Sequence, residues 1–262
     1  MVRNAASLVM IGVLAAVLGA GSSPAHAGGE PRPVREVVGG TVAPQGKFPW
    51  VVRLSMGCGG TLVAPRVVLT AGHCVDGTGA SNRIEITAGV SDLKSRRALT
   101  ARSVSVIRAA GFKDETRGDD WALVQMDRVL HLPALPISPE TIGKGRYTVM
   151  GWGQTREDSV KQERRLHYAT VPMVSDASCA KAYLKAGVKL VRDEQMCAGD
   201  RRVDTCQGDS GGPMVDQDRR GQWVQVGIVS WGLGCARDGY PGVYTQISTF
   251  RPAIVAALSK LQ

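Results

Sequence analysis

The sequence predicts an all-β fold, either a barrel or a sandwich, on three observations. Turn residues recur throughout, and the 262 residues include 32 glycines. Helical spacing appears only at the end, where Phe250, Ile254 and Leu258 follow Ser248, a possible cap, with Pro252 expected in the first turn. Short runs rich in β-branched and apolar residues recur between the turns, a pattern typical of barrels and sandwiches; they lie at 50–54, 66–70, 83–87, 122–126, 147–150, 223–229 and 242–247.

The first 36 residues are expected to lie outside this fold. The apolar stretch at 8–20 is too short to span a bilayer about 30 Å thick. Ala25-His26-Ala27 has the small-x-small pattern of a signal-peptidase site. We therefore interpret 1–27 as a signal peptide, against the alternative of an uncleaved membrane anchor, and 28–36 as a propeptide or linker. The protein is accordingly expected to be secreted.

Charge and cysteine count narrow the class of protein. The net charge is +9, but the 32 Lys and Arg are scattered and are not interleaved with stacking aromatic residues, so we expect no nucleic-acid partner. Six cysteines follow the signal peptide, and an even number in an exported chain predicts disulfides. A zinc site is not expected, because the adjacent pair His73-Cys74 lacks a C-x-x-C partner.

The motif D-T-C-Q-G-D-S-G-G-P at 204–213 carries the strongest chemical signal. A serine hydroxyl is a poor nucleophile unless a base takes its proton, and its attack needs donors aimed at the oxyanion that forms. Gly208 would let the backbone turn so that its N–H and that of Ser210 face the same point. The alternative is a glycine-rich turn with an incidental serine, but the full motif is far more specific than a bare G-x-S-x-G.

The base is expected to be a histidine, and its partner a carboxylate. His73 follows a β run in L-T-A-G-H-C, whereas His131 lies in the Pro-rich connection at 131–146. His167 lies in an alternating stretch and is expected to be a surface or half-buried strand residue. A carboxylate must hold the imidazole, and Asp119 and Asp120 both precede a predicted strand.

His73 in T-A-G-H-C, Asp120 in D-W-A-L and Ser210 in G-D-S-G-G-P, in this order, resemble the chymotrypsin family of serine proteases, and in detail its secreted bacterial trypsins. The resemblance covers essentially all of 37–262. Further matching motifs are V-V-G-G at 37–40, C-G-G-T-L at 58–62, G-W-G at 151–153, S-W-G-L-G-C at 230–235 and P-G-V-Y-T at 241–245.

The resemblance implies a fold and a disulfide pattern. It implies a peptidase domain at 37–262 made of two antiparallel six-stranded β-barrels, at about 37–138 and about 139–247, with a short C-terminal helix at about 248–260. It assigns Asp120 rather than Asp119 as the acid that orients His73. The disulfides that it implies are Cys58–Cys74, Cys179–Cys197 and Cys206–Cys235.

The resemblance also implies an endopeptidase that cuts after Arg or Lys. Ser210 would be the nucleophile, and the N–H groups of Gly208 and Ser210 would hold the oxyanion. Asp204 would lie at the base of the primary pocket and pair with the substrate's cation. Thr205 and Ser230 would add hydroxyls there, and Gly232 and Gly242 would leave the pocket walls open.

Activation is expected to follow cleavage before Val37. The new ammonium would enter the body of the protein and pair with Asp209, so the precursor should be inactive. The bond to be cut follows Glu36, which a trypsin would process poorly. We therefore expect a different protease to make this cut.

Expected partners are protein or peptide substrates with Arg or Lys at the cleavage site, and protein protease inhibitors. We expect a monomer without cofactor, metal or membrane partner; the stretch at 89–99, where many trypsins bind calcium, carries Lys94, Arg96 and Arg97. Three alternative functions are considered. They are a catalytically dead binding homologue, a protease with chymotrypsin- or elastase-like preference, which Asp204 argues against, and an α/β-hydrolase esterase, whose chain order is Ser, acid, His.

Overall fold

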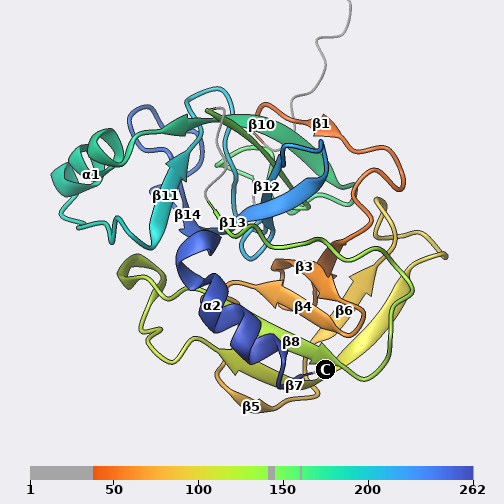
Figure 1. Cartoon of the computed structure of the whole chain (residues 1–262). Helices are drawn as coiled ribbons and strands as arrows, with labels where there is room; N and C mark the ends of the chain where they lie inside the picture. The colour runs from red at the N-terminus through yellow and green to blue at the C-terminus, as the bar shows by residue number, and fades with distance from the viewer. Residues whose placement is uncertain (1–37, 141–144, 160, 262) are drawn as a thin grey trace, which may run out of the picture. The chain divides into compact units, whose positions relative to one another are not determined.

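The computed structural model describes residues 38–140, 145–159 and 161–261. Within these ranges the strands form two antiparallel sheets, and six strands of each sheet close into a ring (Figure 1). One short strand is added to the side of each ring. The two rings confirm the predicted pair of six-stranded barrels.

The first barrel closes where β7 pairs with β8. β5 (Gly79–Ala80) pairs with the side of β7. In order around the ring, the strands are β7 (Leu99–Arg108), β6 (Glu85–Ala88), β2 (Val51–Leu54), β3 (Gly59–Ala64), β4 (Val67–Thr70) and β8 (Ala122–Met126).

The second barrel closes where β10 pairs with β9. β1 (Thr41–Val42) pairs with β10 although it precedes the first barrel in the chain, so it ties the N-terminal part of the described chain to the second barrel. In order around the ring, the strands are β10 (His167–Val174), β11 (Gln195–Ala198), β14 (Gly242–Gln246), β13 (Trp223–Trp231), β12 (Pro213–Gln217) and β9 (Arg146–Gly151).

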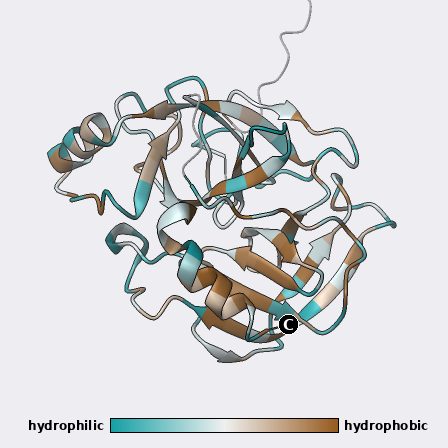
Figure 2. Cartoon of the chain, viewed as in Figure 1, coloured by the Kyte–Doolittle hydropathy of each residue, from teal (hydrophilic) through white to brown (hydrophobic). Residues whose placement is uncertain are grey.

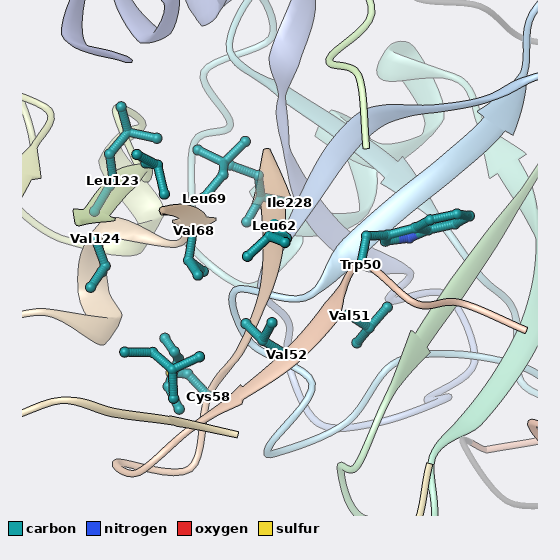
Figure 3. Close-up of a cluster of buried hydrophobic side chains, with 14 of the residues drawn as sticks. Trp50, Val51, Val52, Cys58, Leu62, Val68, Leu69, Leu123, Val124 and Ile228 are labelled. Atoms are coloured by element: carbon teal, nitrogen blue, oxygen red, sulfur yellow. The ribbon is translucent and has the colours of Figure 1, made fainter. Parts of the chain in front are cut away.

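The main hydrophobic core fills the first barrel and continues into the second. Leu62, Leu69 and Leu123 of the first barrel are fully buried, and Ile228 of β13 belongs to the same cluster (Figure 3). The strands β3, β4 and β8 are correspondingly among the most hydrophobic parts of the chain (Figure 2). Each such side chain contributes about 1.5–3 kcal/mol on burial, so the barrels share part of their stabilisation.

The C-terminal helix α2 (Ile247–Leu258) packs against β8 of the first barrel and β13 of the second. Phe250 and Ile254 are buried in the shared core, as their spacing predicts. The possible cap at Ser248 is wrong, because the N-cap is Gln246, two positions earlier, and it makes no side-chain cap bond. Pro252 lies inside the helix, where it has no N–H to donate.

Helix α1 (Asp176–Lys185) corrects the expectation that only the end of the chain is helical. The Ser175 side chain accepts a hydrogen bond from Ser178 N and caps the helix. Only Cys179 and Tyr183 of this helix are buried, so its apolar face is too narrow to give a clear periodic pattern. No helix in the described ranges is long and apolar enough to cross a membrane.

All six cysteines form disulfides, and each bond joins segments that the sequence separates. The pairs are those that the family resemblance implies. They are Cys58–Cys74, Cys179–Cys197 and Cys206–Cys235.

Replacing Ile254 with alanine is expected to lower the free energy of unfolding by about 2–5 kcal/mol, because the side chain is fully buried where the helix meets the core. Val255→Ala, in the same helix but 42% exposed, should change it by less than about 0.5 kcal/mol. Urea unfolding followed by tryptophan fluorescence measures both values. Equal effects of the two substitutions would contradict the packing of α2 on the barrels.

Candidate active site

His73 lies in a short 3-10 turn, Gly72–Cys74, directly after β4. The disulfide from Cys74 to Cys58 ties this turn to the start of β3. The imidazole Nδ1 lies 2.9 Å from Asp120 Oδ2, and the backbone N–H of His73 donates to Asp120 Oδ1 over 2.9 Å. Both oxygens of one carboxylate therefore fix the position of His73 and the orientation of its ring.

Asp120 lies just before β8 and is 1% exposed. Besides the bonds from His73, its Oδ2 accepts a hydrogen bond from Ser230 Oγ over 2.5 Å. Its backbone carbonyl accepts from Thr245 Oγ1 over 2.8 Å. The second barrel thus supplies two hydroxyl donors that hold an acid of the first barrel against His73.

The neighbouring acid, Asp119, lies elsewhere. Its backbone N–H donates to Glu194 Oε2 over 2.9 Å, and its φ is 52°. A Cβ at Gly111 would lie 2.2 Å from Asp119 Oδ2, so this carboxylate covers Gly111. Of the two adjacent acids, the structure brings only Asp120 to His73.

The environment of His73 favours its charged form. Burial lowers the pKa of the imidazole, but the hydrogen bond and charge of Asp120, helped by the charge of Glu115, outweigh burial and raise the pKa above its ordinary value. An imidazole held in this way can take up a proton and keep it close to Asp120. Of the other two predicted candidates, His131 is exposed, and His167 is 1% exposed within β10, more buried than predicted.

Ser210 lies in a tight turn pressed against the strand that leads to His73. Its carbonyl accepts a hydrogen bond from Gly59 N over 2.7 Å, and Gly211 N donates to Val229 O over 2.8 Å. Gly211 has φ of 78°, and a Cβ there would lie 2.1 Å from Thr70 Oγ1. Only glycine therefore allows the turn to approach β4 so closely.

Two backbone donors in this turn find no acceptor among the residues that the structure describes. Within the described ranges, neither Gly208 N nor Ser210 N donates a hydrogen bond, and Ser210 Oγ also makes none. Gly208 is buried, and buried N–H groups without partners are rare. The Gln207 carbonyl accepts from Gln154 N over 2.8 Å, and since a trans peptide is planar, this bond turns the N–H of Gly208 the opposite way.

Asp209 is fully buried. Its Oδ1 accepts from Gly153 N over 2.8 Å, and its Oδ2 accepts from Cys206 N over 3.0 Å. Burial raises its pKa to about 6, although these bonds and the charge of Arg53 act in the opposite direction. In the part of the chain that the structure describes, no cation forms an ion pair with Asp209. Val37, its expected partner, lies outside the described residues.

Asp204 is a second buried carboxylate, 1% exposed. Its two oxygens accept hydrogen bonds from Thr205 N over 2.8 Å and from Ala236 N over 2.9 Å. Burial raises its pKa to about 7, against these backbone bonds. Among the described residues no Lys, Arg or His forms an ion pair with it. A group that is this costly to ionise gains strongly from an added cation.

Of the other predicted pocket residues, Thr205 and Gly242 lie beside Asp204. A Cβ at Gly242 would lie 2.6 Å from Asp204 Oδ1, and one at Gly232 would lie 3.4 Å from the nearest backbone atom. Thr205 Oγ1 lies 3.1 Å from Tyr244 Oη. The Ser230 hydroxyl, expected beside the substrate's cation, donates to Asp120 instead, which leaves its lone pairs to accept.

Several residues that support this site could not be recognised from the sequence. Tyr244 and Thr245 fall in the P-G-V-Y-T motif, but that motif assigns neither a role, and nothing in the sequence indicated Gln154 or the donation from Ser230 to Asp120. Each acts through a partner more than 30 residues away in the chain. No local pattern could have revealed these contacts.

The ligand atoms of Cys58, His73 and Cys74 lie within 4.8 Å of one another, a spacing that a metal could bridge. The two cysteines are bonded to each other, so neither offers the thiolate that a metal ligand requires. This cluster is therefore part of the His73 turn and does not form a thiolate metal site.

Comparisons with known proteins agree with this geometry. The family sequence model described as Trypsin matches residues 37–254. A trypsin-like protease of Streptomyces glaucescens is 47% identical over 228 residues, which cover 86% of this chain and 83% of the relative. Trypsin beta and trypsin delta of Drosophila erecta are each 33% identical over 228 residues, covering 84% of this chain and 87% of each relative. The chain therefore belongs to the trypsin family and is a trypsin-like serine endopeptidase.

Proposed function

We propose that this endopeptidase is secreted, cleaves after Arg or Lys, and is made as an inactive precursor. The observation that carries the specificity is the buried Asp204 carboxylate, which has two backbone donors and, within the described ranges, no cation. The basic side chain of a substrate would supply the missing charge at the end of a long apolar stem. A side chain at Gly242 would press on Asp204 Oδ1, so glycine there leaves the carboxylate accessible to such a stem.

The proposed chemistry uses His73, Asp120 and Ser210 as a triad. Ser210 Oγ attacks the scissile carbonyl carbon while His73 Nε2 takes the hydroxyl proton. The carbonyl oxygen becomes an oxyanion and accepts from Gly208 N and Ser210 N, two donors with no acceptor in the described part of the chain. His73 then gives its proton to the leaving amine, and water repeats the sequence on the acyl-enzyme. Asp120 holds the ring throughout and stabilises its charged form.

The proposed activation pairs a Val37 ammonium with Asp209. The two backbone bonds to Asp209 leave its pKa raised to about 6, so an ionised Asp209 at neutral pH has incomplete compensation. A buried ammonium would supply it and hold the loop that carries Gly208 and Ser210. The family match begins at residue 37, which supports this as the start of the mature chain.

The proposed location and partners follow from the leader and the disulfides. Three disulfides are typical of proteins that fold in an oxidising compartment. The signal peptide at 1–27 and the propeptide at 28–36 lie outside the described residues and stay predictions. We propose a secreted monomer whose partners are Arg- or Lys-containing substrates and protein inhibitors that occupy the same pocket.

The mature chain starting at Val37 is expected to hydrolyse a benzoyl-Arg amide at least about 100-fold faster than the matched Phe amide, because only the Arg substrate neutralises Asp204. Ser210→Ala should lower the rate on the Arg amide by about 10⁴-fold or more, a magnitude taken from the general behaviour of such triads. Asp204→Ser should remove the preference for Arg. Initial-rate kinetics measures all three, and an inactive Val37-started chain would favour a binding homologue.

Binding of benzamidine, an aromatic amidinium cation, is expected to weaken as the pH falls below about 7. Burial holds the pKa of Asp204 near 7, so below that pH the carboxyl is neutral and must lose its proton to pair with a cation. Calorimetry in two buffers should therefore detect close to one proton released at about pH 6, and almost none at about pH 8.5. Asp204→Asn should bind weakly at every pH. An affinity of the unaltered enzyme that is constant from about pH 5.5 to 8.5 would rule out this account of the pocket.

The precursor at 28–262 is expected to be at least about 100-fold less active than the mature chain, since Asp209 then lacks its ammonium partner. Incubation with mature enzyme should not generate a Val37 end, because the bond follows Glu36. A Glu36→Arg precursor should activate itself under the same conditions. N-terminal sequencing and amide hydrolysis measure both, and rapid production of a Val37 end from the unaltered precursor would refute the need for a second protease.

A further inference from the structure

Arg53 lies on β2 of the first barrel and reaches a loop of the second. Its Nη1 donates to the Gly208 carbonyl over 2.9 Å, and its Nη2 donates to Gln162 Oε1. Within the described ranges the guanidinium forms no ion pair, and it stabilises the Asp209 carboxylate through space. A partly buried cation without a paired acid is costly, so its placement calls for a physical reason.

The Gly208 carbonyl belongs to the peptide that links Gly208 to Asp209. The N–H of that same peptide donates to Cys206 O over 3.0 Å. With Arg53 on the carbonyl, both polar edges of the peptide are occupied, and its plane is fixed. The preceding peptide is held separately by the bond from Gln154 N to the Gln207 carbonyl.

These bonds matter because Gly208 itself offers little resistance to rotation. Its φ is 97°, in the region that only glycine adopts easily, and it has no Cβ to restrict neighbouring conformations. Rotation of the Gln207–Gly208 peptide would turn the N–H of Gly208 away. Rotation of the Gly208–Asp209 peptide would displace Asp209 and, with it, the next peptide, which carries the N–H of Ser210. Electrostatic stabilisation of an oxyanion depends on donors that are already in place when charge develops.

We propose that Arg53 is a positioning residue for the oxyanion hole, holding the Gly208 carbonyl so that the N–H groups of Gly208 and Ser210 stay aimed at one point. This inference rests on the proposed function of those two groups as oxyanion donors. Gln162 holds the guanidinium from its other side. The first barrel thus contributes to the oxyanion hole as well as supplying His73.

Arg53→Met in the mature enzyme tests the proposal, because methionine keeps the apolar stem and removes donor and charge. On the Arg amide we expect kcat to fall by about 10- to 100-fold while KM changes by less than about twofold, the pattern of an interaction that acts in the transition state. Arg53→Lys keeps one cationic donor and should recover part of kcat. Arg83→Met, which replaces an arginine with an 83% exposed side chain, is the matched control and should leave kcat unchanged.

A pair of inhibitors separates positioning from general damage. Benzamidine fills the Asp204 pocket without an oxyanion, so its Ki should stay within about twofold in Arg53→Met. A peptidyl argininal is attacked by Ser210 Oγ at the aldehyde carbon, and the aldehyde oxygen becomes the oxyanion while the proton passes to His73. Its Ki should rise by about the same factor as kcat falls.

Several results of these experiments would overturn the role of Arg53 or the proposed function. An unchanged kcat in Arg53→Met, or equal weakening of both inhibitors with a lowered melting temperature, would overturn the proposal. Should Arg53→Met fail to fold, Gln162→Leu decides instead, with a smaller fall in kcat and an unchanged benzamidine Ki expected, and no fall refuting it. An inactive unaltered enzyme would refute the proposed function, whereas an active one that is indifferent to Arg53 and Gln162 refutes only this inference.

Discussion

The buried Asp120 carboxylate is the interaction on which the rest of the site depends. A charge that is 1% exposed is tolerated only when donors surround it, and here the donors come from distant parts of the chain. His73 arrives from the end of β4, and the Ser230 hydroxyl arrives from β13 of the other barrel. The carboxylate is satisfied only when both barrels are folded and correctly joined. The geometry around His73 therefore forms only when the two barrels pack together.

Three buried carboxylates occupy this region, and they differ in how completely the protein compensates them. Asp120 accepts from a side-chain hydroxyl, an imidazole and a backbone N–H. Asp204 and Asp209 each have two backbone donors and, in the described part of the chain, no ion pair, and burial raises their pKa to about 7 and about 6. The protein thus leaves a deficit of positive charge at two places. In the proposed enzyme, the substrate's basic side chain supplies the cation for Asp204. The ammonium of the new N-terminus supplies the cation for Asp209.

The sequence predicted the fold class because both barrels carry short apolar runs divided by turns, and the family resemblance supplied the closure. The strands that the sequence did not predict have a weaker alternation of apolar and polar residues. β7 exposes the apolar Leu99 and Val104, and β3 begins with two glycines. The helix α1 buries only two side chains, so its local propensity was the only signal. The motif around Ser210 was readable because its residues are contiguous in the chain, whereas the bonds that Arg53 and Ser230 make join residues more than 100 positions apart.

The docking of α2 on the first barrel sets the order in which this protein can be completed. Ile254 and Phe250 belong to one cluster with the side chains of β3, β4 and β8, and Gln125 of β8 donates to the Leu261 carbonyl over 2.8 Å. A chain emerging from the ribosome would have made every strand of the first barrel long before the helix that covers it. Its apolar surface would stay in contact with water, and such long-range closure is slow. The core of the first barrel is therefore complete only when the last residues of the chain have been made.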